Sequence, residues 1–211
     1  CGLEEGSIYM GANETALHCF LFEQLESFRQ KYPAIKLRIQ SSTTPDAMHM
    51  LKERAIELAV VSGPVEAEHK MRKTAVGEFQ DILIGGPRFR QLARRTLRLE
   101  ALTRYPLILL SRGTKTRDFY EDFFQQYGLS VEPDIEVASA DLILPMVIHN
   151  LGIGFLPREI ARPELEKGTV VELQQEEDIP PRKIFLLEDL ERKLSVAAEQ
   201  LKEMITRQKE E

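Results

Sequence analysis

The chain has 211 residues, of which 43% are hydrophobic and 29% charged, a composition typical of a globular protein with one large core or two modest ones. Its formal net charge of −6 argues against a fragment that binds nucleic acid by itself, because neutralising phosphates requires clustered Lys and Arg. No apolar run approaches the roughly 20 residues that span a bilayer, and the N-terminus shows no export signal. We therefore expect a soluble protein without a membrane partner.

The chain contains two cysteines, Cys1 and Cys19, which is too few for a disulfide framework and favours a reducing compartment. Cys1 allows two interpretations, since a fragment boundary and the first residue of a mature bacterial lipoprotein both place a cysteine there. We favour the boundary and keep the lipoprotein as an alternative. Cys19 lies within a helical pattern and is expected to be a small, partly buried apolar residue.

The first 63 residues alternate between strand and helix. Strands are expected at 7–10, 35–40 and 58–61, and the last of these is continuously apolar, as the interior of a parallel sheet requires. A helix with its apolar residues at helical spacing separates the first two strands, and a second helix opens at Thr44-Pro45-Asp46. The inward residues of the first helix are expected to be Leu17, Phe20, Leu21, Leu25 and Phe28. This order predicts a parallel sheet with helices on its faces.

The alternation breaks at Ser62-Gly63-Pro64 and resumes further along the chain. A polar stretch at 65–72 is followed by a strand near 80–85 and a basic segment at 88–98. Further strands are expected at 107–110, 135–138, 153–156, 170–173 and 184–187. Three helices are expected: one with Phe119, Phe123 and Tyr127 inward, a fully buried one at 142–148 capped by Ser139, and a final one capped by Ser195 with Ala197, Leu201 and Ile205 inward. The tail at 207–211 is a solvated run of charges.

Motifs for catalysis or metal binding are missing from the sequence. The four histidines have no second ligand at metal spacing, and Ser62 lacks the helix that a nucleophile elbow needs. Gly152-Ile153-Gly154 precedes a strand, whereas a dinucleotide fingerprint follows one, so we expect Gly152 to end a helix and Gly154 to allow close packing. We expect no metal, no cofactor and no enzymatic activity.

Four strand-to-helix loops are rich in small polar residues, and ligands of open α/β sheets bind beyond the carboxyl ends of the strands. The loops are 11–15, 41–44, 111–117 and 138–141. Each hydroxyl either caps its own helix or contacts a ligand, and the residues alone leave both alternatives open. The candidate ligand-binding residues are Asn13, Glu14, Thr15, Ser42, Thr43, Ser62, Ser111, Arg112, Thr114 and Ser139.

The order of these segments resembles the effector-binding domain of LysR-type transcriptional regulators. The most specific stretch is Met146 to Pro157 (MVIHNLGIGFLP), a glycine-containing string after a predicted helix. Weaker support comes, in the right order, from GSIYMG at 6–11, FRQKYP at 28–33 and IELAVV at 56–61. The sequence departs from the family in having Ala55-Ile56-Glu57 where Gly-Leu-Asp is usual, and in the acidic Glu14 where small hydroxyl residues are common.

This resemblance implies an α/β, type 2 periplasmic-binding-protein fold, with two Rossmann-like subdomains, a cleft and two crossover segments near Ser62-Gly63-Pro64 and Pro180-Pro181. Subdomain I would comprise 1–63 plus 182–211, and subdomain II would comprise 64–181. The resemblance also implies a homodimer, a tetramer of the full-length protein, and DNA binding only through a winged helix-turn-helix that this chain lacks.

We therefore interpret the chain as the domain of a cytoplasmic transcriptional regulator that senses a small-molecule metabolite in the cleft. A zwitterionic or hydroxylated metabolite suits a lining that contains Glu14 and Arg112 better than a simple dicarboxylate. The first alternative is an extracytoplasmic solute-binding lipoprotein of the same fold, and the second is an enzyme on this fold. Phe22 falls outside the core stripe of its helix, which indicates either a dimer surface or a contact with a neighbouring loop.

Overall fold

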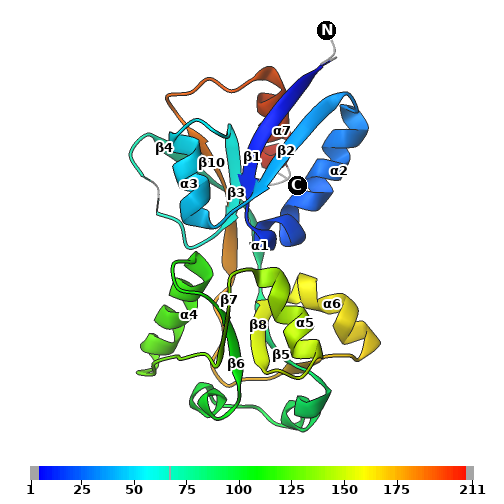
Figure 1. The fold of residues 1–211 in the computed structure, drawn as a ribbon, viewed down its shortest axis with the longest axis vertical. Helices are drawn as coiled ribbons and strands as arrows, with labels where there is room; N and C mark the ends of the chain where they lie inside the picture. Colours follow the sequence, from blue (N-terminus) through cyan, green and yellow to red (C-terminus); the bar gives the residue numbers. More distant parts are fainter. Residues whose placement is uncertain (1–4, 67, 208–211) are drawn as a thin grey trace. The chain divides into compact units, whose positions relative to one another are not determined.

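The computed structural model describes residues 5–66 and 68–207, so Cys1 and most of the predicted charged tail lie outside the described residues. The chain divides into two compact units (Figure 1). The first comprises Cys1–Glu78 with Lys183–Glu211, and the second comprises Phe79–Arg182. The chain therefore crosses from one unit to the other at Glu78–Phe79 and returns at Arg182–Lys183.

The first unit is built on a five-stranded sheet in the order β2-β1-β3-β10-β4. β1 pairs in parallel with both β2 and β3, as the strand–helix alternation predicted, and β10 pairs antiparallel with β3. The strands are β1 (Gly6–Ala12), β2 (Ile35–Ser41), β3 (Leu58–Ser62), β4 (Met71–Phe79) and β10 (Arg182–Asp189). All five residues of β3 are buried, which explains its unbroken apolar sequence.

The helices that cover this sheet form at the sequence segments where they were predicted. The first is continuous through α1 (Glu14–Ala16), a π-helical turn (Leu17–Leu21) and α2 (Phe22–Lys31), and it is followed by α3 (Thr44–Lys52) and, at the C-terminus, α7 (Val196–Arg207). Of the expected inner stripe, Leu21, Leu25 and Phe28 are buried, whereas Leu17 and Phe20 are half-buried. Half-burial at these two positions coincides with the π-helical turn, which carries one extra residue per turn and so rotates the following side chains.

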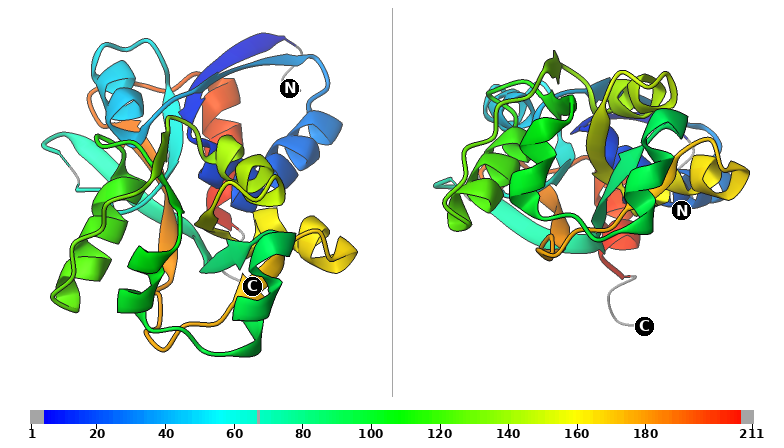
Figure 2. Two further views of the ribbon diagram at one scale, coloured as in Figure 1. Left: turned by 60° about the horizontal axis from the view of Figure 1, so that its bottom comes forward. Right: turned by 90° about the horizontal axis from the view of Figure 1, so that it is seen from below.

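The C-terminal helix belongs to the first unit, as its apolar face predicted. Ala197, Leu201 and Ile205 are buried, and α7 packs against α2 and β1, which the red and blue helices show in Figure 2. The Ser195 hydroxyl accepts a hydrogen bond from the Ala198 N–H at 3.2 Å and caps the helix, also as predicted. The C-terminal segment from Lys183 onward thereby completes the core that the first third of the chain begins.

Residues 64–78 fall in the first unit, whereas we expected the crossover near Ser62-Gly63-Pro64. The difference arises because the sequence analysis overlooked β4. This strand lies at the edge of its sheet and is exposed at several positions, so its sequence (MRKTAVGEF) lacks the apolar run of a buried strand. The return crossing, at Arg182–Lys183, lies one residue beyond the expected boundary.

The second unit contains another five-stranded sheet, in the order β7-β6-β8-β5-β9. β6 is parallel to β7 and β8, whereas β5 runs antiparallel to β8 and β9. The strands are β5 (Asp81–Gly85), β6 (Leu107–Leu110), β7 (Ile135–Val137), β8 (Ile153–Pro157) and β9 (Val171–Leu173). The helices are α4 (Lys115–Gln126), α5 (Ile143–Ile148) and α6 (Arg158–Lys167), with 3₁₀ segments at Pro87–Arg94, Leu99–Arg104 and Ala140–Leu142.

Three details of this unit differ from the expectations. Tyr127 is 48% exposed because α4 ends before it, and Tyr120 and Phe124 take the inward positions beside Phe123. The helix expected at 142–148 is only partly buried, since Leu142 is 45% exposed. The sequence analysis also overlooked α6. The basic segment at 88–98 is largely exposed and begins as 3₁₀ helix, which ends at Arg94.

Gly154 has the packing role that the sequence indicated, whereas Gly152, which was expected to end a helix, lies beyond the end of α5 at Ile148 and is also closely packed. A Cβ on Gly152 would lie 2.5 Å from the Pro106 carbonyl oxygen, and one on Gly154 would lie 2.8 Å from the Cγ2 atom of Ile143. Both distances are below contact range, so no larger side chain fits without moving its neighbour. Glycine is therefore required here for close approach of the backbone.

Truncating a core residue of α7 tests the contribution of this helix to the first unit. Leu201→Ala is expected to lower the free energy of unfolding by about 2–5 kcal/mol, because Leu201 is fully buried and its removal leaves a cavity. Val196→Ala, on the same helix but 71% exposed, is expected to change it by less than about 0.5 kcal/mol. Urea denaturation of both variants measures the difference, and equal effects would contradict the packing of α7 described above.

Candidate functional site

The side chain of Asn13 joins three chain segments in the first unit. Its Nδ2 atom donates to the Ser62 hydroxyl at 2.9 Å and to the Thr44 hydroxyl at 3.3 Å. Its Oδ1 atom accepts from the Ala16 N–H at 2.9 Å, which caps the first helix, and from the Ser62 N–H at 3.3 Å. The amide thus holds the end of β3 and the start of α3 to the end of β1.

The hydroxyl partners of Asn13 are buried. Ser62 is 1% exposed, and Thr44, which the sequence analysis assigned only to a helix start, is 2% exposed. The predicted residue Thr15 is also buried, at 5% exposed. The Thr44 hydroxyl donates to the Ser62 carbonyl oxygen at 3.3 Å, and so it completes the cluster. Asn13, Thr44 and Ser62 therefore satisfy one another and build the frame of the loops.

The loop after β2 contributes the other candidates of the first unit. The Ser41 hydroxyl donates to the Glu14 carboxylate at 2.8 Å, which gives that acid a partner from the neighbouring loop. Thr43 caps α3 by accepting from the Asp46 N–H at 3.3 Å, and it donates to the Asp46 carboxylate at 2.6 Å. Between them, the Ser42 hydroxyl oxygen is buried and has no hydrogen-bond partner among the described residues. Ser42 is thus the candidate whose hydrogen-bonding capacity is left unused.

In the second unit two of the predicted hydroxyl residues, Thr114 and Ser139, cap helices. The Thr114 hydroxyl donates to the Ser111 carbonyl oxygen at 3.0 Å and accepts from the Arg117 N–H at 3.2 Å, at the start of α4. The Ser139 hydroxyl accepts from the Asp141 N–H at 3.3 Å. Arg112 is exposed and pairs with Glu121 at 3.3 Å, an interaction that solvent screens. Capping accounts for these contacts, while the proposed contacts with a ligand remain predictions.

Arg117, which the sequence analysis overlooked, fixes the same loop from inside. Its side chain is 1% exposed and donates to the Leu110 carbonyl oxygen at 3.2 Å, at the end of β6. It also pairs with Glu121 at 2.8 Å and with Glu136 at 3.0 Å. The charge is buried with two acidic partners, as a buried guanidinium requires.

A fully buried ion pair joins the first and last segments of the same unit. The Arg182 guanidinium donates to the Asp81 carboxylate at 3.0 Å, and the Tyr120 hydroxyl donates to the same carboxylate oxygen at 2.6 Å. Burial raises the pKa of Tyr120 well above its usual value, and the negative charge of Asp81 raises it further. The phenol therefore stays protonated and remains a donor to Asp81.

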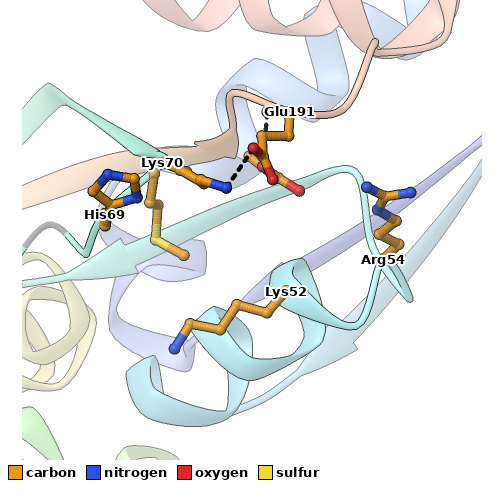
Figure 3. Close-up of a pocket in the computed structure, with 7 residues that line it drawn as sticks. Lys52, Arg54, His69, Lys70 and Glu191 are labelled. Atoms are coloured by element: carbon orange, nitrogen blue, oxygen red, sulfur yellow. Dashed lines mark hydrogen bonds and ion pairs between the residues drawn. The ribbon is translucent and has the colours of Figure 1, made fainter.

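A cavity of about 220 Å³ in the first unit collects basic side chains at the far end of α3 from its Thr43 cap (Figure 3). Lys70 pairs with Glu191 at 2.6 Å, and Lys52 pairs with Glu68. Each of these side chains is about half exposed, so solvent screens both ion pairs. None of the residues that line this cavity is among the predicted ligand-binding residues.

Among residues 5–66 and 68–207, no three His, Cys, Asp or Glu side chains are grouped so as to hold a metal ion. None of the described helices is long and apolar enough to span a bilayer.

Replacing Asn13 tests its role as the frame of these loops. Asn13→Ala is expected to lower the free energy of unfolding by about 2–4 kcal/mol, because the change removes a helix cap and strips the buried Ser62 hydroxyl of a donor. Ser139→Ala is the control, since it removes a single cap and is expected to cost about 1 kcal/mol. Similar losses in denaturant titrations of the two variants would argue against a frame built on Asn13.

Comparisons with known proteins identify the family to which this chain belongs. A family model described as the LysR substrate binding domain matches residues 2–210. The chain is 23% identical over 170 residues to the uncharacterized HTH-type transcriptional regulator YeiE of Escherichia coli K12, covering 81% of this chain and 57% of that protein. It is 25% identical to the HTH-type transcriptional activator CmpR of Synechocystis sp., covering 74% and 50% respectively. The chain thus spans about half the length of the curated relatives that it matches.

Solved structures share the fold. The effector binding domain of QuiR, solved in complex with shikimate, superposes with a TM-score of 0.83 at 19% identity and covers 97% of each chain. The regulatory domain of Synechocystis CcmR, solved in complex with 2-PG, has the same TM-score and identity, covering 96% of this chain and 97% of that one. The two-lobe, type 2 periplasmic-binding-protein fold expected from the sequence is therefore confirmed.

Proposed function

Because the chain belongs to the family of LysR substrate binding domains, we propose that it senses a small-molecule effector for a bacterial transcriptional regulator. The family match over nearly the whole chain is the observation that carries the proposal. The curated relatives are HTH-type regulators about twice as long as the matched region, which supports a separate helix-turn-helix domain as the part that binds DNA. They also favour the regulator over the solute-binding lipoprotein, and a cytoplasmic location follows from that role.

The kind of effector is supported by the solved relatives and by the loops of this chain. QuiR was solved with shikimate, CcmR with 2-PG and OxyR2 with sulfate, all of which are small ligands. In this chain Ser42 offers an unused buried hydroxyl beside the first turn of α3, whose backbone N–H groups favour an acceptor. Glu14 lies on the neighbouring loop, so a zwitterionic or hydroxylated metabolite suits this part of the site better than a dicarboxylate.

The residues proposed to contact the effector follow from the same reasoning. In the first unit they are Ser42 and Thr43 together with Glu14 and Thr15, with Asn13 and Ser62 holding the loops in place. In the second unit they are Ser111, Arg112, Thr114 and Ser139. Binding there requires no chemical step and no cofactor. The effector would act by binding one conformation more tightly than another and so shifting their populations.

A thermal-shift screen of metabolites against the 211-residue chain tests this function. A true effector at 100 times its dissociation constant is expected to stabilise the folded state by about 2.7 kcal/mol. We expect Ser42→Ala to weaken that effector by about tenfold or more with little change in the melting temperature of the free protein, because the hydroxyl has no described partner to lose. A Ser42→Ala variant that binds normally would remove Ser42 from the site.

Thr43→Ala and Ser139→Ala separate capping from binding. Loss of either cap is expected to cost about 1 kcal/mol of stability in any case. If these hydroxyls also contact the effector, titration calorimetry should show affinity falling by about tenfold or more. Normal affinity with a lower melting temperature would leave both residues as caps alone.

Dimerisation is proposed through the first helix. Phe22 is 49% exposed, and its ring packs edge-on against that of His18, with centroids 5.2 Å apart, so the apolar surface is available to a second copy. Phe22→Glu is expected to produce a folded monomer in sedimentation velocity. Ser27→Glu places the same charge at another exposed position of α2 and should leave the dimer intact. Persistence of the dimer in Phe22→Glu would exclude this surface.

A further inference from the structure

In the second unit, one buried side chain joins the segment where the chain enters the unit to the segment where it leaves. We propose that Arg182 is a positioning residue that fastens both crossings to this unit and couples them to the first turn of α4. Only the functional meaning of this coupling rests on the proposed function: α4 begins directly after the loop at 111–114, which we propose as part of the effector site. The contacts themselves are independent of any ligand.

The ion pair between Arg182 and Asp81 ties the crossings together. Asp81 comes two residues after the chain enters the second unit at Phe79, and Arg182 is the last residue before the chain leaves it. The two residues are 101 positions apart in the sequence, yet their side chains lie 3.0 Å apart and are 3% and 1% exposed. Separating them would leave an uncompensated charge inside the unit, which is strongly unfavourable. The entering and leaving segments are therefore expected to move as one body.

Aromatic rings hold the Arg182 guanidinium from two elements. Its central carbon lies 5.1 Å from the centroid of the Phe79 ring and 4.7 Å from that of Phe119. Phe79 is the first residue of the unit, and Phe119 lies on α4. A planar guanidinium stacks on such rings in a way that an ammonium group does not. The stacking thus adds α4 to the group of elements that this side chain holds.

Two hydrogen bonds complete the link to α4. Arg182 Nη2 donates to the Thr116 hydroxyl at 2.8 Å, and the Tyr120 hydroxyl donates to Asp81 at 2.6 Å. Thr116, Phe119 and Tyr120 are spaced i, i+3 and i+4, and so they share one face of α4. That face contacts both members of the ion pair. A displacement of the first turn of α4 must therefore move the two crossings or break these contacts.

Hydrogen exchange of the 211-residue chain without effector tests the proposal. Arg182→Lys keeps the charge but has one nitrogen, so it cannot hold Asp81 and Thr116 in the same fork geometry. We expect amide exchange at 79–82 and 182–184 to become about tenfold faster in Arg182→Lys. Thr116→Val removes only the hydroxyl at nearly equal volume and is expected to make exchange at the same amides about threefold faster. Thr116→Ser keeps the hydroxyl and should leave the exchange rate unchanged.

Arg117→Lys is the matched control. Arg117 is buried like Arg182 and lies on α4 next to Thr116. It pairs with two carboxylates, but its described hydrogen bonds go to Leu110, Glu121 and Glu136. Its replacement should speed exchange near β6 and β7 and leave the crossings unchanged. Unaltered exchange at the crossings in Arg182→Lys and Thr116→Val would overturn the proposal, as would equal effects of Arg117→Lys there. If Arg182→Lys fails to fold, Thr116→Val decides alone. Because no effector is added, either result leaves the thermal-shift test of function standing.

Discussion

A buried strand that ends inside a protein leaves polar backbone groups that something other than the sheet must satisfy. In the first unit the Asn13 side chain meets this need, since its amide joins the ends of β1 and β3 to the starts of the first helix and α3. In the second unit Arg117 does so for β6 by donating to the Leu110 carbonyl. Both side chains lie near the start of a helix, so the partly buried Asn13 holds the candidate loop at 11–15 and the fully buried Arg117 holds the one at 111–117.

The parts of the fold that were predicted from sequence are those whose burial leaves a local pattern. Leu58–Val61 and Leu107–Leu110 are continuously apolar because both faces of these strands are covered, and both were expected. β4 has no such pattern, since an edge strand is partly exposed. α6 was overlooked for a different reason: it begins directly after Pro157 and contains Pro163, a residue type that usually disrupts a helix interior.

The loops that carry the candidate residues could be predicted from the sequence, but the contacts within them could not. Hydroxyl residues before helices indicate caps, and Thr43, Thr114 and Ser139 are caps. The interactions that shape the site join residues far apart in the sequence, such as Asn13 with Ser62 and Asp81 with Arg182. A single sequence contains no signal for such pairs, because an isolated Asp or Arg looks the same whether it is solvated or buried.

The chemistry of Asp81 and Arg182 also explains why an apolar pair would not serve equally well. Buried ion pairs add little net stability, and apolar residues of similar volume often stabilise a core more. Apolar contacts have no direction, however, so α4 would be free to slide against the crossing segments by small steps. The guanidinium instead requires Asp81 at one nitrogen, Thr116 at another and rings on its faces. One arrangement satisfies all of these at once, which makes the position of α4 and that of the crossings a single variable.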